Sequence, residues 1–136
     1  MKIFIACSKH FYDRIPVIKE HLEKMGHSVH LPNSFDAPMT EEEMKKNGPD
    51  AHRAWKASML RKDHDNISAN DAIVVLNFEK KGQLNYIGGA TFLEIAKAFE
   101  LEKKIFLHNP VPESIFKDEL LGMGVVVING DLTQIR

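Results

Sequence analysis

The chain has 136 residues, enough for one domain with a complete hydrophobic core and too few for two ordinary domains. It carries 18 basic and 19 acidic residues, which leave a formal net charge of -1. This balance predicts neither binding to a nucleic acid polymer nor attachment to an anionic membrane surface. Small molecules are therefore the expected partners.

Two further exclusions concern compartment and metals. No apolar run approaches the roughly 20 residues that a membrane-spanning helix needs, and the N-terminus lacks the layout of a secretory leader, so we expect a cytoplasmic protein. Cys7 is the only cysteine, which excludes an intrachain disulfide and a zinc site built from several cysteines. The histidines show no spacing typical of metal ligands, and we expect no metal and no cofactor.

Short apolar runs predict five strands, and the segments between them mostly carry helical patterns. The strands are predicted at Lys2–Ala6, Ser28–Leu31, Ala72–Leu76, Lys104–Leu107 and Val125–Ile128. The helices are predicted within 15–25 with Gly26 as the C-terminal cap, from a capping-box pattern at Thr40, over 49–70, over Thr91–Glu102 and over Glu113–Leu121. Strands that alternate with helices indicate a parallel sheet with helices on both faces.

This alternation predicts a single α/β domain over residues 1–136, with a doubly wound, flavodoxin-like or Rossmann-like sheet of five parallel strands. The length of the first crossover favours the strand order 2-1-3-4-5. In that order, the ligand crevice lies at the carboxyl ends of strands 1, 3 and 4. Residues 7–12, 77–90 and 108–112 are then the loops that matter most.

Glu94 is the first candidate for catalysis. An apolar run at 72–76, a loop with two glycines and a helical pattern follow one another, a layout that places backbone N–H groups and a helix N-terminus at the edge of a parallel sheet. Glu94 stands about one turn inside this helix, among mostly apolar neighbours. A carboxylate in a largely buried helix needs a reason. The alternative is an ordinary helix residue that pairs with Lys97 or reaches solvent.

Four segments together resemble one family, the nucleoside 2-deoxyribosyltransferase superfamily, which includes the 2′-deoxynucleoside 5′-monophosphate N-glycosidases. The segments are Ile3-Phe4-Ile5-Ala6-Cys7-Ser8, Asp63-His64-Asp65-Asn66-Ile67, Asn70-Asp71-Ala72-Ile73-Val74-Val75 and Gly89-Ala90-Thr91-Phe92-Leu93-Glu94-Ile95-Ala96-Lys97-Ala98. The resemblance covers roughly residues 2–108 in order and spacing. It implies that Glu94 is the nucleophile and that Asp63 contacts the sugar or assists the leaving base. For Asp63 the alternative is a surface aspartate beside Lys62.

The resemblance also implies a partner and a substrate class. Members of the family build their active sites with help from a neighbouring subunit, so we expect at least a homodimer. The predicted helix with Trp55, Met59 and Leu60 offers apolar surface for that contact. The expected ligand is a nucleoside or nucleotide, and the expected reaction is N-glycosidic bond cleavage or deoxyribosyl transfer.

Two positions depart from the family pattern. Phe4 stands where members carry a tyrosine that hydrogen-bonds the nucleophile, and phenylalanine cannot donate. Gly88 stands where members have an aspartate or a serine, six residues before the glutamate. The turn at Gly88 and Gly89 can instead offer backbone N–H groups to a phosphate.

Further candidates for substrate binding lie in the three loops. Cys7, Ser8 and Lys9 follow strand 1, where polar groups commonly meet ligands, although Cys7 also fits as a small apolar filler. Tyr86 can supply the missing phenol or close its loop against the core. Asn109 can bind ligand or serve the turn before Pro110. His52 and Lys56, by contrast, are predicted to form a solvated helix face.

Three functions compete. The leading one is the enzyme described above, acting through Glu94 with help from Asp63. The second is a nucleotide-binding sensor of the same fold without turnover, which Phe4 and Gly88 both favour. The third is a flavodoxin-like module for a cofactor such as flavin, and it ranks last because the first loop lacks the phosphate cradle rich in Ser, Thr and Gly.

Overall fold

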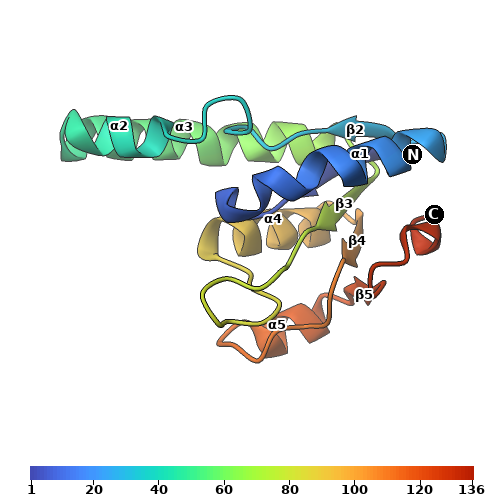
Figure 1. Ribbon diagram of the computed structural model, residues 1–136. Helices are drawn as coiled ribbons and strands as arrows, with labels where there is room; N and C mark the ends of the chain where they lie inside the picture. Colours follow the sequence, from blue (N-terminus) through green and yellow to red (C-terminus); the bar gives the residue numbers. More distant parts are fainter.

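A computed structural model describes residues 1–136. In chain order, the helices and strands are β1 (Lys2–Ala6), η1 (Lys9–Arg14), α1 (Ile15–Lys24), β2 (Ser28–His30), α2 (Thr40–Lys46), α3 (Pro49–Ser68), β3 (Ala72–Val75), α4 (Gly89–Glu100), β4 (Lys104–Leu107), α5 (Lys117–Gly122), β5 (Val126–Val127) and η2 (Leu132–Gln134). Figure 1 shows how they are arranged around one sheet. The predicted alternation of strands and helices is confirmed.

The five strands form one parallel sheet in the order β2-β1-β3-β4-β5. This is the predicted order and the flavodoxin-like arrangement. β1 and β3 are neighbours at the centre, where Ile5 pairs with Val74 in register. The carboxyl ends of these two strands therefore lie together, and the loops that follow them meet at the same edge of the sheet.

Side chains of β1 alternate between the two faces of the sheet, as the two-residue period of a strand requires. Ile3 and Ile5 pack with residues of α1 on one face, together with the C-terminal segment around Ile135. Phe4 and Ala6 pack on the other face with residues of α3, α4 and α5. Because both faces are covered, the central strands are buried throughout and read as continuous apolar runs.

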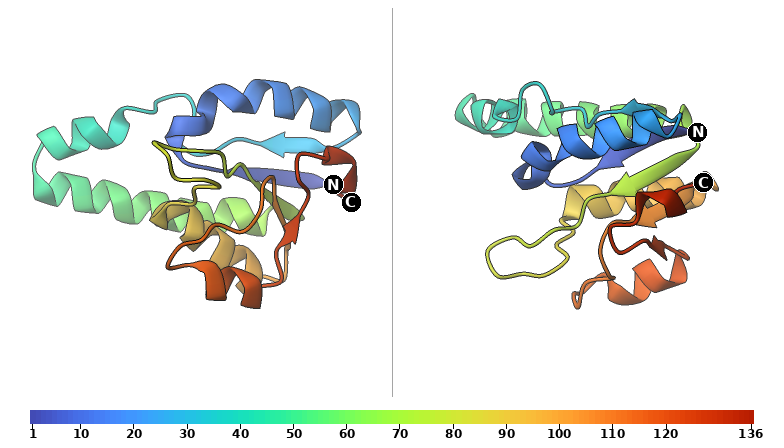
Figure 2. Two further views of the ribbon diagram at one scale, coloured as in Figure 1. Left: turned by 60° about the horizontal axis from the view of Figure 1, so that its bottom comes forward. Right: turned by 45° about the vertical axis from the view of Figure 1, so that its right-hand side comes forward.

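The helix α3 is longer than the sheet that it covers. It has 20 residues, about 30 Å by helical rise, and only its C-terminal part contacts the core through Ile67. Both views in Figure 2 show its N-terminal half projecting past the carboxyl ends of the strands, with α2 folded back beside it. Residues 32–47 and the N-terminal half of α3 thus form a wall over the edge of the sheet where ligands bind in this fold.

Three local predictions need correction. The expected capping box at Thr40 is absent, because the Thr40 hydroxyl donates to the carbonyl of Ala37 and α2 has no side-chain cap. The last helix begins at Lys117 and not at Glu113, since the hydroxyl of Ser114 accepts the backbone N–H of Phe116 in a turn that precedes the helix. The last strand contains only Val126 and Val127. The predicted helix cap at Gly26 is confirmed by its positive φ of 92°.

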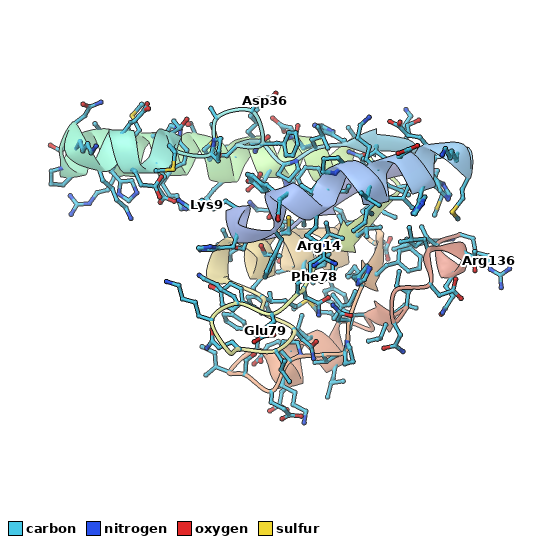
Figure 3. All side chains as sticks on the ribbon, viewed as in Figure 1. Lys9, Arg14, Asp36, Phe78, Glu79 and Arg136 are labelled. Carbon is cyan, nitrogen blue, oxygen red and sulfur yellow. The ribbon has the colours of Figure 1, made fainter.

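The loop after β3 is held in place by an aromatic stack. The guanidinium of Arg14 lies 3.9 Å from the ring centroid of Phe78, and Figure 3 shows the two residues side by side. The ring of His108 packs against Phe78 with centroids 4.8 Å apart. This stack fixes the start of the loop whose far end leads into α4.

None of the helices has the length and apolar character that crossing a membrane requires.

Candidate active site

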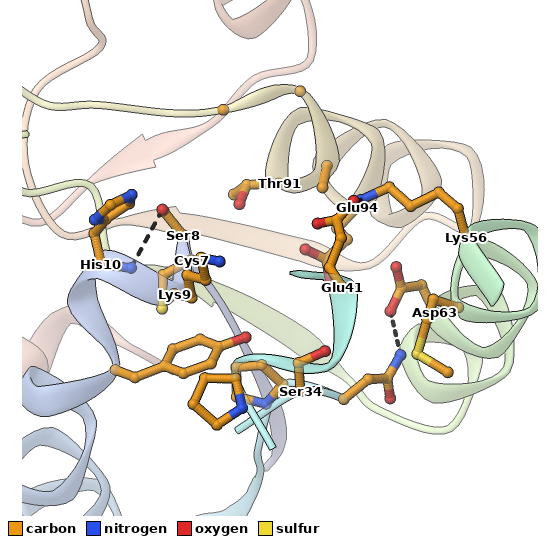
Figure 4. Close-up of a pocket in the computed structure, with 18 of the residues that line it drawn as sticks. Cys7, Ser8, Lys9, His10, Ser34, Glu41, Lys56, Asp63, Thr91 and Glu94 are labelled. Carbon is orange, nitrogen blue, oxygen red and sulfur yellow. Dashed lines mark hydrogen bonds and ion pairs between the residues drawn. The ribbon is translucent and has the colours of Figure 1, made fainter. Parts of the chain in front are cut away.

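A cavity of about 300 Å³ opens at the carboxyl ends of the strands, beneath the wall formed by α2 and the N-terminal half of α3. Its lining comes from the loop after β1, the loop after β2, α3, and the loop and first turns of α4. It brings together eight of the nine residues that the sequence predicted for the site: Cys7, Ser8, Lys9, Asp63, Tyr86, Gly88, Gly89 and Glu94. Figure 4 shows Glu94 and Asp63 on one side of the cavity and Ser8 and His10 on the other.

Glu94 is buried, with 8% of its surface exposed. Burial raises the pKa of its carboxyl well above the usual value, and the negative charge of Asp63 adds to the rise, while Lys97 and Lys56 oppose it. Lys97 does not form the ion pair considered as the alternative role for Glu94. Its ammonium donates instead to the backbone carbonyl of Leu60 on α3, at 2.6 Å.

Asp63 is also buried and lies on α3, the helix packed beside α4. Its Oδ1 accepts a hydrogen bond of 2.6 Å from the side-chain amide of Asn33. Burial raises the pKa of Asp63 to about 6, against the opposing charges of Lys97, Lys56 and Lys62. Two carboxyl groups with raised and coupled pKa values therefore face one cavity. Such a pair is typical of sites that carry out acid–base or nucleophilic chemistry.

Lys56 lies in the cavity wall, which corrects the prediction that it belongs to a solvated face. Its ammonium is 3.2 Å from Glu41 Oε2, and the same oxygen is 2.9 Å from Nε2 of His52. The reason is tertiary: α2 folds against α3 and covers the helix face that would otherwise be solvated. Figure 4 shows the ends of Lys56, Glu41 and Glu94 directed toward one another. The charge of Lys56 opposes the rise in the pKa of both buried carboxyl groups.

The opposite side of the cavity is electropositive. Helix α4 begins after Gly88 without a side-chain cap, so the N–H groups of its first turn are left for a ligand. Lys9, His10 and Lys80 also line this side; Lys9 forms an ion pair with Glu42, and burial together with the charges of Lys80, Lys81 and Lys9 lowers the pKa of His10. A Cβ at Gly88 would lie 3.0 Å from the Tyr86 hydroxyl, so a larger residue there would require the Tyr86 side chain to shift. Lys80 donates to that hydroxyl at 3.4 Å.

Tyr12 is a site residue that the sequence argument missed. Its phenol lines the cavity, and its pKa is raised by burial and by the negative charges of Cys7, Glu94 and Asp63. Phe4, at the family's tyrosine position, lies in the core, edge-on to His30. Tyr12 and Tyr86 thus both bring a phenol to the cavity. The available signal for Tyr12 was its place in the loop 7–12, which had been predicted to face the crevice.

Asn109 lies outside the cavity lining. Its backbone N–H donates to Asn77 Oδ1 at 2.8 Å, and its side-chain amide donates to the Asn77 carbonyl at 3.0 Å. The Asn77 amide in turn donates to the carbonyls of Asn109 and Pro110, both at 3.0 Å. These bonds tie together the loops that follow β3 and β4. The structure therefore gives Asn109 the turn role that was its alternative interpretation.

Comparisons with known proteins find similarity of structure but not of sequence. No protein-family model matches the sequence, and no curated protein matches it. The CMP N-glycosidase BcmB of Clostridium botulinum superposes with a TM-score of 0.57 at 17% identity, covering 94% of this chain and 88% of that one. A 2-deoxyribosyltransferase of Bacillus psychrosaccharolyticus superposes with a TM-score of 0.53 at 17% identity, covering 79% of this chain and 71% of that one.

A third structure, the flavoenzyme NAD(P)H:(acceptor) oxidoreductase FerB of Paracoccus denitrificans, gives a TM-score of 0.49 at 14% identity, covering 93% of this chain and 74% of that one. At that TM-score the likeness has no bearing on function. The first two matches agree with the resemblance predicted from the sequence. The chain has the fold shared by a CMP N-glycosidase and a 2-deoxyribosyltransferase.

Proposed function

We propose that this protein cleaves the N-glycosidic bond of a nucleoside 5′-monophosphate, or transfers its deoxyribosyl group, with Glu94 as nucleophile and Asp63 as general acid. The observation that carries the proposal is the buried pair of carboxyl groups in one cavity. The fold shared with two enzymes that act on such bonds supports it. The cavity, at about 300 Å³, lies at the lower end of the range for small-molecule sites.

The chemistry needs two carboxyl groups in different states. The Glu94 carboxylate attacks the anomeric carbon, the bond from that carbon to the base nitrogen breaks, and its electron pair leaves with the base. A proton from Asp63 neutralises the departing base. Burial raises the pKa of both groups, so a proton is available at the pair, and the positive charge that develops at the anomeric carbon favours the ionised form of Glu94. Water or a second base then cleaves the glycosyl ester.

A 5′-phosphate suits the electropositive side of the cavity. The uncapped N-terminus of α4 offers backbone N–H groups, Lys80 lines the cavity beside it, and the imidazole of His10 can donate a further hydrogen bond. This side lies across the cavity from Asp63, as Figure 4 shows for Ser8 and His10. A nucleotide that places its phosphate there and its anomeric carbon at Glu94 directs its base toward Asp63. The apolar side chains of Trp55, Met59 and Leu60 line that end of the cavity.

The deciding experiment is an assay for free base. The protein is incubated with a panel of ribonucleosides, deoxynucleosides and their 5′-monophosphates, and the released base is separated and quantified. We expect release from at least one monophosphate and slower release from the matching nucleoside. Release from none of the compounds, together with tight nucleotide binding, would overturn the enzymatic proposal in favour of a sensor.

A matched pair of variants tests the phosphate subsite. Lys80→Met removes a cation beside the α4 N-terminus, whereas Lys81→Met removes one from the next residue, which does not line the cavity. We expect Lys80→Met to raise KM for the monophosphate several-fold while leaving the nucleoside unaffected, and Lys81→Met to change neither. Equal effects of the two variants would contradict the proposed position of the phosphate.

A further inference from the structure

A line of asparagine side chains lies behind Asp63 and leads away from the cavity. Asn66 Nδ2 donates to Asn33 Oδ1 at 2.5 Å, and Asn33 Nδ2 donates to Asp63 Oδ1 at 2.6 Å. Just after the end of α3, Asn70 Nδ2 donates to the backbone carbonyl of Asn66 at 2.6 Å and contacts Nδ1 of His30 at 3.1 Å. Helix α3 and the loop after β2 are thus joined through amide groups that end on the Asp63 carboxyl.

The bonds in this line have a direction. An asparagine side chain has one accepting oxygen and one donating nitrogen. A donor bound to the oxygen therefore leaves the nitrogen facing the opposite side of the amide group. Because Asn66 donates to the Asn33 oxygen, the Asn33 nitrogen faces Asp63. Asp63 Oδ1 therefore receives an N–H and is the accepting oxygen of the carboxyl group. When the group is protonated, its proton has to reside on Oδ2.

A proton on Oδ2 lies on the side of Asp63 that faces the cavity. Figure 4 shows the second oxygen of Asp63 directed away from the bond to Asn33 and toward the side of Glu94. Asp63 is 9% exposed and lines the cavity, so its side chain contacts either neighbouring protein groups or the cavity itself. A proton held on Oδ2 points into the cavity, where a substrate would lie. A proton on Oδ1 would point toward the loop after β2.

We propose that Asn33, held by Asn66, is a positioning residue that keeps the transferable proton of Asp63 on the oxygen that faces the substrate. This inference rests on the proposed function, in which Asp63 protonates the leaving base. In this role Asn33 acts through Asp63 and does not contact the reacting atoms. Its effect is on the proton-donating step alone, and not on the attack by Glu94.

The test compares two leaving groups. One substrate is the best nucleotide from the panel, whose base needs a proton to leave. The other is 4-nitrophenyl 2-deoxyribofuranoside 5-phosphate, whose nitrophenolate leaves as a stable anion. We expect Asn33→Ala to lower kcat for the nucleotide by roughly 10-fold or more and to leave the nitrophenyl substrate within about twofold of wild type. Asp63→Asn should show the same pattern more strongly, while Glu94→Gln should slow both substrates.

A matched control comes from the same line of side chains. Asn70→Ala removes a buried amide that serves the helix end and does not touch Asp63 or the cavity. We expect Asn70→Ala to lower the melting temperature without separating the two substrates. Asn66→Ala should reproduce the leaving-group pattern of Asn33→Ala in weaker form, because it frees the Asn33 amide to rotate.

An NMR titration of the wild-type protein tests the inference without catalysis, and it applies also if a variant folds poorly or the nitrophenyl substrate is not cleaved. In the folded wild-type protein, the side-chain amide resonances of Asn33 should shift with pH as Asp63 titrates, and this shift should be lost in Asp63→Asn. The charged groups that act on Asp63 are Glu94 and Lys97 on α4, and Lys56 and Lys62 on its own helix. Absence of the shift overturns the inference.

The remaining outcomes separate the inference from the function that it rests on. If wild type releases base and Asn33→Ala slows both substrates equally or neither, the positioning role is wrong and the proposed function stands. If wild type releases no base from any compound, the proposed function fails and the role of Asn33 fails with it.

Discussion

Glu94 places a carboxyl group where ionisation is costly. It lies on a largely apolar helix, 8% exposed, where the charge of Asp63 adds to the rise of its pKa and Lys97 forms no ion pair with it. Burying a carboxylate without a direct partner destabilises the fold, because the charge loses its hydration. Residues kept in such positions are candidates for function, and two of them share one cavity here.

Replacing Glu94 by glutamine tests the proposed nucleophile. The change keeps the shape of the side chain and removes its charge, so nucleotide binding should persist while base release falls by at least about 10³-fold. Glu100→Gln, at the exposed end of the same helix, is the matched control and should leave the rate unchanged. Equal base release by wild type and Glu94→Gln would exclude the mechanism.

Asp63 makes the stability of the protein depend on pH in a defined direction. Its pKa in the folded protein is about 6, above the ordinary value of 3.8. A raised carboxyl pKa contributes stability below about pH 4 that is lost as the pH rises through about 6. We expect the free energy of unfolding of wild type, relative to that of Asp63→Asn, to fall by about 2 kcal/mol between pH 4 and pH 7.

Urea unfolding of both proteins across this range measures that difference. Asp65→Asn is the control, because Asp65 is exposed on the same helix and its replacement changes the net charge equally. Curves for wild type and Asp63→Asn that run parallel across the pH range would show that burial does not perturb Asp63.

At the scale of elements, the site depends on how α3 lies against α4. Asp63 and Glu94 come from different helices, so their separation is set by packing and by the bond from Lys97 to the Leu60 carbonyl. That bond joins the two helices within about one turn of both carboxyl groups. The same ammonium lowers the pKa of Asp63 and of Glu94. Lys97 therefore acts on both the geometry and the charge of the pair.

Replacing Lys97 by methionine should have two effects. Loss of a charge-assisted hydrogen bond should reduce the free energy of unfolding by about 1–2 kcal/mol. Loss of the positive charge should raise the pKa of both carboxyl groups, so the rise of kcat/KM with pH on the acidic side should move to higher pH.

Lys103 offers a matched control for this prediction. It makes a similar bond to the carbonyl of Ser68 at the end of α3, at 3.1 Å, but that bond is exposed and Lys103 does not affect the pKa of Asp63 or Glu94. Lys103→Met should change stability by less than about 0.5 kcal/mol and leave the pH profile in place. Identical pH profiles of Lys97→Met and wild type would show that Lys97 serves only to hold the helices together.

At the scale of the whole molecule, the expected homodimer stays a prediction. Trp55, Met59 and Leu60, the residues expected at its contact, are half-buried in the cavity wall. Two of the most exposed large apolar side chains, Leu84 at 70% and Ile115 at 89%, line a separate groove between the loops that follow β3 and β4. Exposed apolar side chains gathered in one groove favour burial against a second copy of the chain.

Sedimentation or light scattering at tens of micromolar protein tests this surface. We expect a mass of at least twice 15.5 kDa for wild type and a shift to monomer in Ile115→Asp. Val17→Asp, at another exposed apolar residue on α1, should leave the mass unchanged. A wild-type mass of 15.5 kDa would contradict the prediction.

Local patterns in the sequence determined the fold and most of the site. Periodicity predicted the parallel sheet, because buried strands and amphipathic helices differ in their apolar spacing, and the length of the first crossover predicted the strand order. The edge of the sheet then followed from topology, and eight predicted residues line its cavity. Glu94 could be identified because a carboxylate on an apolar helix contradicts the local pattern.

Tertiary packing alone decided the rest. Lys56 lies in the cavity because α2 folds over it, and Asn33 meets Asp63 across 30 positions of sequence. Tyr12, on η1, brings a phenol to the cavity, whereas Phe4, on β1, lies in the core. Contacts of this kind depend on how the wall of the cavity packs, and a single sequence carries no periodic signal for them. The local pattern therefore located the site, while long-range packing set the partners and charges of its carboxyl groups.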